Sequence, residues 1–370
     1  MGIIIWLRKS TSFKSRKEGF NVNKILVIFT GGTIGSRKTD KTLNVDGSTS
    51  YFLLDQYNNS KYKQDVSFET SQPINILSED LIPKDWLVLY QTLNQLDLSI
   101  YRGIIITHGT DTLPFTSSAI SYLFNWSPVP IVITASNHPL EDERNNGFRN
   151  FVNSVDFILG EGLPGVFVIF ENDQQESIVY LGTRLTQAAP FTHQFDSVSS
   201  VVFGKMKDSK FTKYEHPSNP SLEELKKPRK RIDLPQVKFD SDIVYIKPYP
   251  GLNYSYYDFS ARKPKAIIHD LYHSGTACTR IADRNQYSLI EFTQQCIDEG
   301  IGVFISPIKD VTGDLYASSN KILEAGAYSL PNISIEASIV KLMLAYGIFS
   351  DEYHVLNLMR ETFFYEYVTY

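Results

Sequence analysis

The sequence predicts an α/β protein built on a large, mainly parallel sheet. Short apolar runs alternate with helical patterns from about residue 24 to residue 207. Two of these runs, residues 25–29 and 103–106, are apolar throughout, and each leads directly into a turn containing glycine and threonine. Parallel strands covered by helices on both faces are buried on both sides, and their functional groups gather at their carboxyl ends. We therefore expect a functional site where these two strands end.

A first domain is expected over residues 24–214, with a Rossmann-like or flavodoxin-like arrangement. Its predicted strands and helices alternate along the chain: strands at 25–29, 103–107, 130–134 and 165–170, and helices around 83–94, 114–123 and 146–158. Residues 1–23 are interpreted as a flexible or loosely docked N-terminal extension.

A linker and a smaller α/β domain are expected after the first domain. Residues 215–241 are rich in Pro, Lys, Ser and Glu, lack a sustained apolar period and include the basic run 226–231. The second domain, residues 242–370, is predicted to hold strands at 243–246, 266–268 and 302–305, and helices at 288–299 and 335–346. A chain of 370 residues is long enough for two domains.

Composition narrows the class of function. The chain is 42% hydrophobic and 21% charged, as in soluble globular proteins, and its net charge is −5 with no concentrated basic face. This argues against nucleic acid as a partner, because phosphate binding needs clustered Lys and Arg. The apolar segment 3–7 is too short for a membrane span, and basic residues follow rather than precede it, unlike a signal peptide. With only two cysteines, we expect a cytoplasmic protein without disulfides, a cysteine zinc site or a membrane association.

The two turns carry residues suited to nucleophilic chemistry. The first, residues 30–35, reads TGGTIG, and the second, residues 107–112, reads THGTDT. The hydroxyl of Thr33 or Thr110 becomes a nucleophile only when a neighbour removes its proton. Gly31 and Gly32 allow a substrate to approach the backbone, where N–H groups stabilise an oxyanion. Asp111 is suited to accept a proton or hold an ammonium group, and equally to cap the following helix.

Other familiar sites do not fit the spacing. The first turn is neither a dinucleotide fingerprint nor a phosphate loop, and no Gly-x-Ser-x-Gly elbow occurs. His269 and His273 flank a strand end, where packed or solvated histidines are more common than metal ligands.

The two turns, in this order, resemble the signature motifs of the bacterial L-asparaginase family, and more closely its cytoplasmic type I branch. Further segments are similar to other landmarks of that family, and the resemblance covers nearly everything after Asn23. These segments are residues 76–80 (ILSED), 83–86 (PKDW), 135–140 (ASNHPL), 146–150 (NGFRN), 248–251 (PYPG) and 335–337 (IEA).

The resemblance implies hydrolysis of a small amino-acid amide, such as asparagine, to a carboxylate and ammonia without a metal or cofactor. By position, Thr33 is the nucleophile, and Thr110 and Asp111 belong to a second triad. The implied substrate-binding residues are Gly32, Ser78, Glu79, Thr110, Asp111 and Ser136. Family members form their sites between subunits, so a homodimer or homotetramer is implied.

Two positions depart from the family pattern, and both concern proton transfer. The lysine of the second triad aligns with Gln187, which carries no charge and cannot act as a base. An ungapped count places Leu43 where the family has a lid tyrosine, and a loop shift would bring Tyr51 or Tyr57 there instead. Candidate substitutes for the missing lysine are His193, Lys205 and Lys207.

Three functions remain open from the sequence. The first is an asparaginase-like amidohydrolase, impaired by Gln187. The second is a noncatalytic protein on the same fold that binds an amino acid or acts as a scaffold. The third is the asparaginase-like subunit of a tRNA-dependent amidotransferase, for whose extra N-terminal domain we find no segment.

Overall fold

The computed structural model describes residues 23–32, 36–39, 42–45, 48–232, 234, 236–281, 286–308 and 315–369. Thr33 and the extension before residue 23 therefore lie outside the described residues, as does Tyr370.

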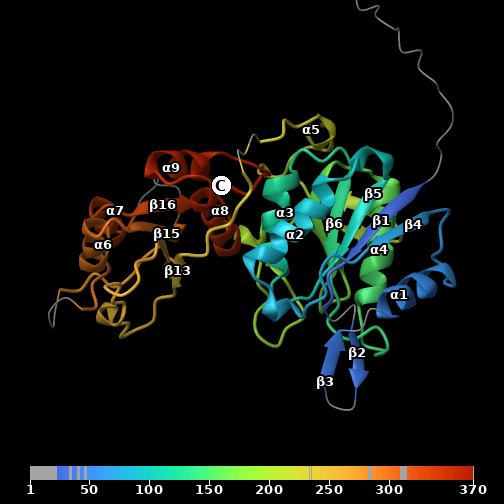
Figure 1. Cartoon of the computed structure of the whole chain (residues 1–370), viewed down its shortest axis with the longest axis horizontal. Coiled ribbons are helices and arrows are strands. Elements are labelled where there is room, and N and C mark those ends of the chain that lie inside the picture. Colours follow the sequence, from blue (N-terminus) through green and yellow to red (C-terminus); the bar gives the residue numbers. More distant parts are fainter. Residues whose placement is uncertain are drawn as a thin grey trace, which may run out of the picture.

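The first domain is built on an eight-stranded sheet in the order β12-β11-β8-β7-β6-β5-β1-β4 (Figure 1). The five strands from β4 to β7 are parallel, and β8, β11 and β12 continue the sheet in antiparallel fashion. The strands are β1 (Lys24–Phe29), β4 (Ser67–Ser71), β5 (Gly103–Thr107), β6 (Pro130–Thr134), β7 (Gly165–Glu171), β8 (Ser177–Leu181), β11 (Gly204–Lys207) and β12 (Lys210–Lys213). Every residue of β5, β6 and β7 is buried, as the apolar runs at their centres predict.

Helices cover both faces of this sheet (Figure 1). On one face α4 (Gly147–Gly160) packs on β5, β6 and β7, and α1 (Ser48–Asn58) lies beside it. On the other face α3 (Leu113–Phe124) packs on β6 and β7 and against α2 (Pro83–Asn94). Two short hairpins, β2 (Ser36–Thr39) with β3 (Thr42–Val45) and β9 (Leu185–Thr186) with β10 (Asp196–Ser197), complete this half.

The second half holds a four-stranded parallel sheet in the order β13-β14-β15-β16. Its strands are β13 (Ile243–Ile246), β14 (Ala266–Asp270), β15 (Gly302–Ile308) and β16 (Tyr328–Pro331). Its helices are α6 (Leu289–Asp298), α7 (Ala317–Glu324), α8 (Ile335–Ile348) and α9 (Glu352–Arg360). It has a separate apolar core, while α8 also packs on α3 of the first sheet. The predicted fold class, a large mainly parallel sheet with a smaller α/β unit, is confirmed; the boundaries 24–214, 215–241 and 242–370 stay predictions.

The basic run 226–231, which begins at the last residue of α5 (Leu222–Lys226), is mostly exposed, but two of its arginines contact the first domain. The Arg229 guanidinium donates hydrogen bonds to the carbonyl oxygens of Asn125 and Pro164, the latter over 2.8 Å. The Arg231 guanidinium lies 5.0 Å from the centre of the Trp126 ring. Arginine can dock on a folded surface because its planar head bonds to carbonyls and stacks on rings. This part of the chain is therefore attached to the first domain.

A strap formed by residues 363–369 joins the two halves. Its carbonyl groups accept hydrogen bonds from the first domain, from Asn125 and Thr183 among others. Within the second half, the Lys341 ammonium of α8 pairs with the Glu366 carboxylate of the strap over 2.8 Å, and both side chains are completely buried. The strap therefore fixes α8 to the first domain.

Among the described helices, none combines the length and the apolar character that crossing a bilayer requires.

Candidate functional site

The two threonine-bearing turns begin where the strand order reverses. Strand β1 lies between β4 and β5 in the sheet. After β1 the chain continues to β4 on one side, whereas after β5 it continues to β6 on the opposite side. In open α/β sheets, ligands bind in the crevice at such a switch point, beyond the carboxyl ends of the strands. Phe29 pairs in register with Thr107, so the two turns start side by side. The Thr30 hydroxyl donates to the Thr107 carbonyl over 2.8 Å and holds the turns together.

Glycines let three chain segments meet at this point. Gly32 has a φ of +71°, and a Cβ atom on it would lie 2.5 Å from the backbone nitrogen of Gly109. A Cβ atom on Gly109 would lie 2.6 Å from the Cβ atom of Ser78. Any side chain at either glycine would push the segments apart, so the two motifs and the Ser78 segment form one packed unit.

Ser78 and the second motif are joined by side-chain hydrogen bonds. Ser78 is buried at the start of a short 3₁₀ helix, Ser78–Asp80, and its hydroxyl donates to a carboxylate oxygen of Asp111 over 3.4 Å. The Thr112 hydroxyl donates to the Ser78 carbonyl over 2.8 Å. The structure thus brings together Gly32, Ser78 and Asp111, which the sequence analysis assigned to one site.

A cavity of about 300 Å³ opens beside Thr110 and Asp111, and we call it the sheet-edge cavity. Its other wall is the segment 187–193, which contributes Gln187, Phe191 and His193. Asn137 and Phe195 also line it. The cavity size and the mixture of polar and apolar walls suit a small polar molecule.

The Gln187 side chain does not take the place of a lysine beside the Asp111 carboxylate. Its amide nitrogen donates to the backbone carbonyl of Asp111 over 3.4 Å. Among the described residues, Ser78 alone donates a hydrogen bond to the Asp111 carboxylate, and none forms an ion pair with it. This leaves the carboxylate charge available to a cationic group of a ligand.

Glu336 holds the Gln187 segment from the second half of the molecule. It lies in the first turn of α8, and its buried carboxylate accepts a 2.8 Å hydrogen bond from the Gln187 backbone N–H. Burial raises the pKa of the Glu336 carboxyl. The sequence analysis used Glu336 only as a landmark, because a contact across 149 residues leaves no local signal.

The three candidate substitutes for the missing lysine differ in whether they line the sheet-edge cavity. His193 lines the sheet-edge cavity together with Thr110, Asp111 and Gln187. Lys205 pairs with Glu176 over 3.4 Å, and Lys207 is exposed on the same strand, β11; neither residue lines the cavity. His193 is therefore the one of the three that shares the cavity with Asp111.

The remaining predicted residues differ in whether they are buried, exposed or outside the described part of the chain. Ser136 is buried, and its hydroxyl donates to the His138 carbonyl over 2.5 Å, while Glu79 is exposed. Tyr57 is not a lid residue: it is completely buried, with its ring edge-on to Phe68 at 5.4 Å. Leu43 falls in β3, but its side chain and that of Tyr51 lie outside what the structure describes, as does the whole of Thr33.

His108, inside the second motif, has a structural role. Its ring contacts the Thr116 hydroxyl at 2.9 Å, and the Trp86 indole donates to the same hydroxyl over 3.0 Å. Burial lowers the pKa of the His108 imidazole to about 4, so the ring is neutral near pH 7. No group of three or more His, Cys, Asp or Glu side chains able to hold a metal occurs in the described part of the chain.

A doubly wound first domain and a second parallel sheet define a two-domain α/β protein, with a small cavity at the switch point where ligands bind in open α/β sheets. Comparison with known proteins is more specific. A family described as "Asparaginase, N-terminal" matches residues 24–219, more than half of the chain. The protein therefore belongs to the asparaginase family.

Individual relatives extend this likeness over most of the chain. The L-asparaginase of Thermococcus kodakarensis is 27% identical over 344 residues, covering 91% of this chain and 96% of that protein. L-asparaginase 1 of Escherichia coli K12 is 26% identical over 337 residues, covering 86% and 90%. A glutamyl-tRNA(Gln) amidotransferase subunit of Methanococcus maripaludis is 24% identical over 337 residues, covering 88% and 76%.

Solved structures agree on the fold. The thermostable L-asparaginase from Thermococcus kodakarensis superposes with a TM-score of 0.75, covering 94% of this chain and all of that chain, at 27% identity. L-asparaginase I from Vibrio cholerae, at 22% identity, superposes with a TM-score of 0.73 and supports the fold alone. The expected relationship to the asparaginase family, including proteins named L-asparaginase 1 or I, is confirmed.

Proposed function

We propose that the protein is an asparaginase-like amidohydrolase that converts the side-chain amide of asparagine, or of a related small amino-acid amide, into a carboxylate and ammonia. The observation that carries this proposal is the position of Thr110 and Asp111 in the wall of a cavity of about 300 Å³ at the switch point, with buried Ser78 hydrogen-bonded to the Asp111 carboxylate. Membership of the asparaginase family supports the same reaction.

The proposed roles follow the charges and hydroxyls of the site. The Asp111 carboxylate binds the substrate ammonium group, and the Ser78 and Glu79 segment faces its carboxylate. Thr33 attacks the amide carbon, the C–N bond breaks and ammonia leaves; water then hydrolyses the resulting ester and frees Thr33. The backbone near Gly32 and Ser136 stabilises the oxyanion. Thr110 and Gln187 complete the second set of residues, with no metal or cofactor involved.

Ammonia release tests this proposal. Purified protein given asparagine, glutamine or short β-amides should release ammonia, and Thr33→Ala should abolish that release while preserving the thermal unfolding midpoint. Equal ammonia release by the Thr33→Ala variant and the parent protein would overturn the proposal.

Gln187 favours a second candidate function, a noncatalytic protein that binds an amino acid or acts as a scaffold. The groups around Asp111 that would hold an amino acid are present, whereas the family lysine is absent. Calorimetry that shows saturable aspartate or asparagine binding, together with no turnover, would support this candidate. Turnover that depends on Thr33 would exclude it.

We also propose a homodimer or homotetramer located in the cytoplasm. Phe191, at the rim of the sheet-edge cavity, is fully exposed, which suits a contact with a second copy of the chain. Sedimentation should give the mass of a dimer or tetramer, and a monomer at micromolar concentration would contradict this proposal.

A further inference from the structure

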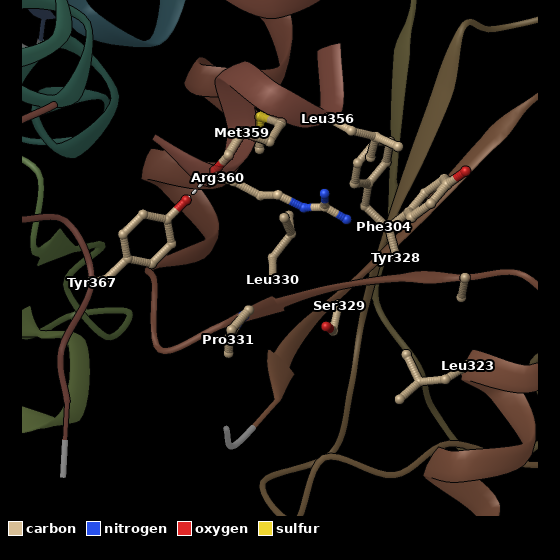
Figure 2. A pocket seen from close by; sticks show the side chains of 11 residues that line it. Phe304, Leu323, Tyr328, Ser329, Leu330, Pro331, Leu356, Met359, Arg360 and Tyr367 are labelled. Atoms are coloured by element: carbon tan, nitrogen blue, oxygen red, sulfur yellow. Dashed lines mark hydrogen bonds between the residues drawn. The ribbon is translucent and has the colours of Figure 1, made fainter. Parts of the chain in front are cut away.

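A second cavity, of about 430 Å³, lies in the smaller half of the molecule (Figure 2). It is bounded by β15 and β16 on one side and by α7 and α9 on the other. Its walls are mainly apolar: Phe304, Leu330 and Met359 form a buried base, and Leu356 lies beside them. We call it the Arg360 cavity, after the one charged residue of its lining.

The guanidinium of Arg360 extends into this cavity above Leu330 (Figure 2). Arg360 is the last residue of α9, and its side chain forms no hydrogen bond or ion pair with another described residue. The nearby carboxylate of Glu352 instead interacts with the Tyr328 hydroxyl. Because the Glu352 carboxylate bonds to the Tyr328 hydroxyl and forms no ion pair with the arginine, the Arg360 guanidinium keeps its five donors for a ligand.

The cavity walls are held in place from behind. The Tyr367 hydroxyl donates to the Met359 carbonyl, as the dashed line in Figure 2 shows. The buried ammonium of Lys341 donates to the same carbonyl over 3.2 Å while it pairs with Glu366. A site with fixed walls binds with a smaller loss of conformational entropy than one that must be ordered by its ligand.

We propose that the Arg360 cavity binds a monocarboxylate with a compact apolar body, such as an aromatic or branched-chain organic acid. The carboxylate pairs with the Arg360 guanidinium, and the apolar body displaces water from Phe304, Leu330 and Leu356. The volume lies within the range of about 300–1,000 Å³ typical of small-molecule sites. No described residue of the lining is acidic, and the nearby Glu352 carboxylate is already bonded to the Tyr328 hydroxyl, so the lining itself offers no carboxylate to the ammonium group of an amino acid. This separates the Arg360 cavity from the sheet-edge cavity, where Asp111 supplies such a group.

The chemistry can be tested with probes that differ in one group. Calorimetry on the full chain would use phenylacetate, benzoate and 4-methylpentanoate, with phenylacetamide and phenylalanine as controls. At least one of the three acids should bind saturably. Phenylacetamide and phenylalanine should each bind at least about tenfold more weakly than phenylacetate. Binding should persist with saturating aspartate, which occupies the proposed amide site. The proposal fails if none of the acids saturates by about 10 mM, a Kd corresponding to roughly 3 kcal/mol of binding, or if phenylacetamide binds as well as phenylacetate.

Variants locate the binding on the protein. Arg360→Gln should weaken binding of the acid about tenfold or more. Arg360→Lys should retain part of the affinity, because lysine keeps the positive charge but lacks the two parallel N–H donors of a guanidinium. Leu356→Trp should block binding by filling the cavity. Arg262→Gln is the matched control, since Arg262 is exposed and pairs with Asp242 elsewhere in the same half. Unchanged binding in Arg360→Gln, with folding confirmed by circular dichroism, would overturn the proposal. These measurements are independent of asparagine hydrolysis.

Discussion

Two carboxylates in this protein, Glu366 and Asp111, have opposite surroundings. Glu366 is completely buried, pairs with the Lys341 ammonium over 2.8 Å and also accepts backbone N–H groups from Phe363 and Phe364. Asp111 is exposed beside the sheet-edge cavity, and its neighbour across that cavity is the uncharged Gln187. A carboxylate whose charge is neutralised internally holds the fold together. One whose charge is left open can bind a ligand.

The largest expected effect is on stability and comes from breaking the buried ion pair between Lys341 and Glu366. Lys341→Met leaves the Glu366 carboxylate buried without its cation, so the free energy of unfolding should fall by about 3–5 kcal/mol. Urea unfolding followed by circular dichroism measures this change. Lys265→Met, which breaks the more exposed pair with Asp240, should cost only about 0–1 kcal/mol. Equal losses in the two variants would show that burial does not distinguish these pairs.

The next effect concerns the open carboxylate. Gln187→Lys places an ammonium at the family position near Asp111, and asparagine turnover should rise about tenfold or more, as expected when a positioned base is restored. Ala189→Lys is the control, because Ala189 lines the same cavity at another position. The rate of ammonia release distinguishes the two variants. No gain over the parent protein would show that another group, such as His193, already performs this task.

The smallest effect concerns the support of the Gln187 segment. Glu336→Ala removes the acceptor of the Gln187 N–H, and the loss of about 1 kcal/mol from one hydrogen bond should lower kcat/KM roughly fivefold. Glu336→Gln keeps an acceptor oxygen at the same place and should retain most of the activity. Steady-state kinetics on both variants, with thermal unfolding midpoints recorded alongside, separates positioning from stability. Equal activity of the two variants would exclude a positioning role for Glu336.

The sequence predicts the central strands of the fold because a strand buried on both faces consists of consecutive apolar residues. Ile104, Ile105 and Ile106 are completely buried in β5, as an apolar run implies. Strand β12, at the edge of the sheet, and its neighbour β11 each carry two lysines in four residues, KFTK and GKMK, and such short polar segments have no distinctive period. They belong to the sheet because of their partners, so local sequence does not identify them.

The candidate site was predictable to the extent that it is local. The glycines at 32 and 109 and the residues Thr110 and Asp111 follow strands directly, so the switch point brings them together. The role of Glu336 and the burial of Tyr57 depend on segments far away in the chain. A tertiary contact of this kind leaves no trace in residue spacing.

The strap of residues 363–369 has a consequence for how the protein is made. A ribosome releases these residues after every strand and helix that they join. Each sheet can form its own core earlier, but their mutual arrangement, and with it the contact between Glu336 and Gln187, is secured only once residues 363–369 have been synthesised. A product truncated before the strap would carry both sequence motifs and still lack the staple that assembles them.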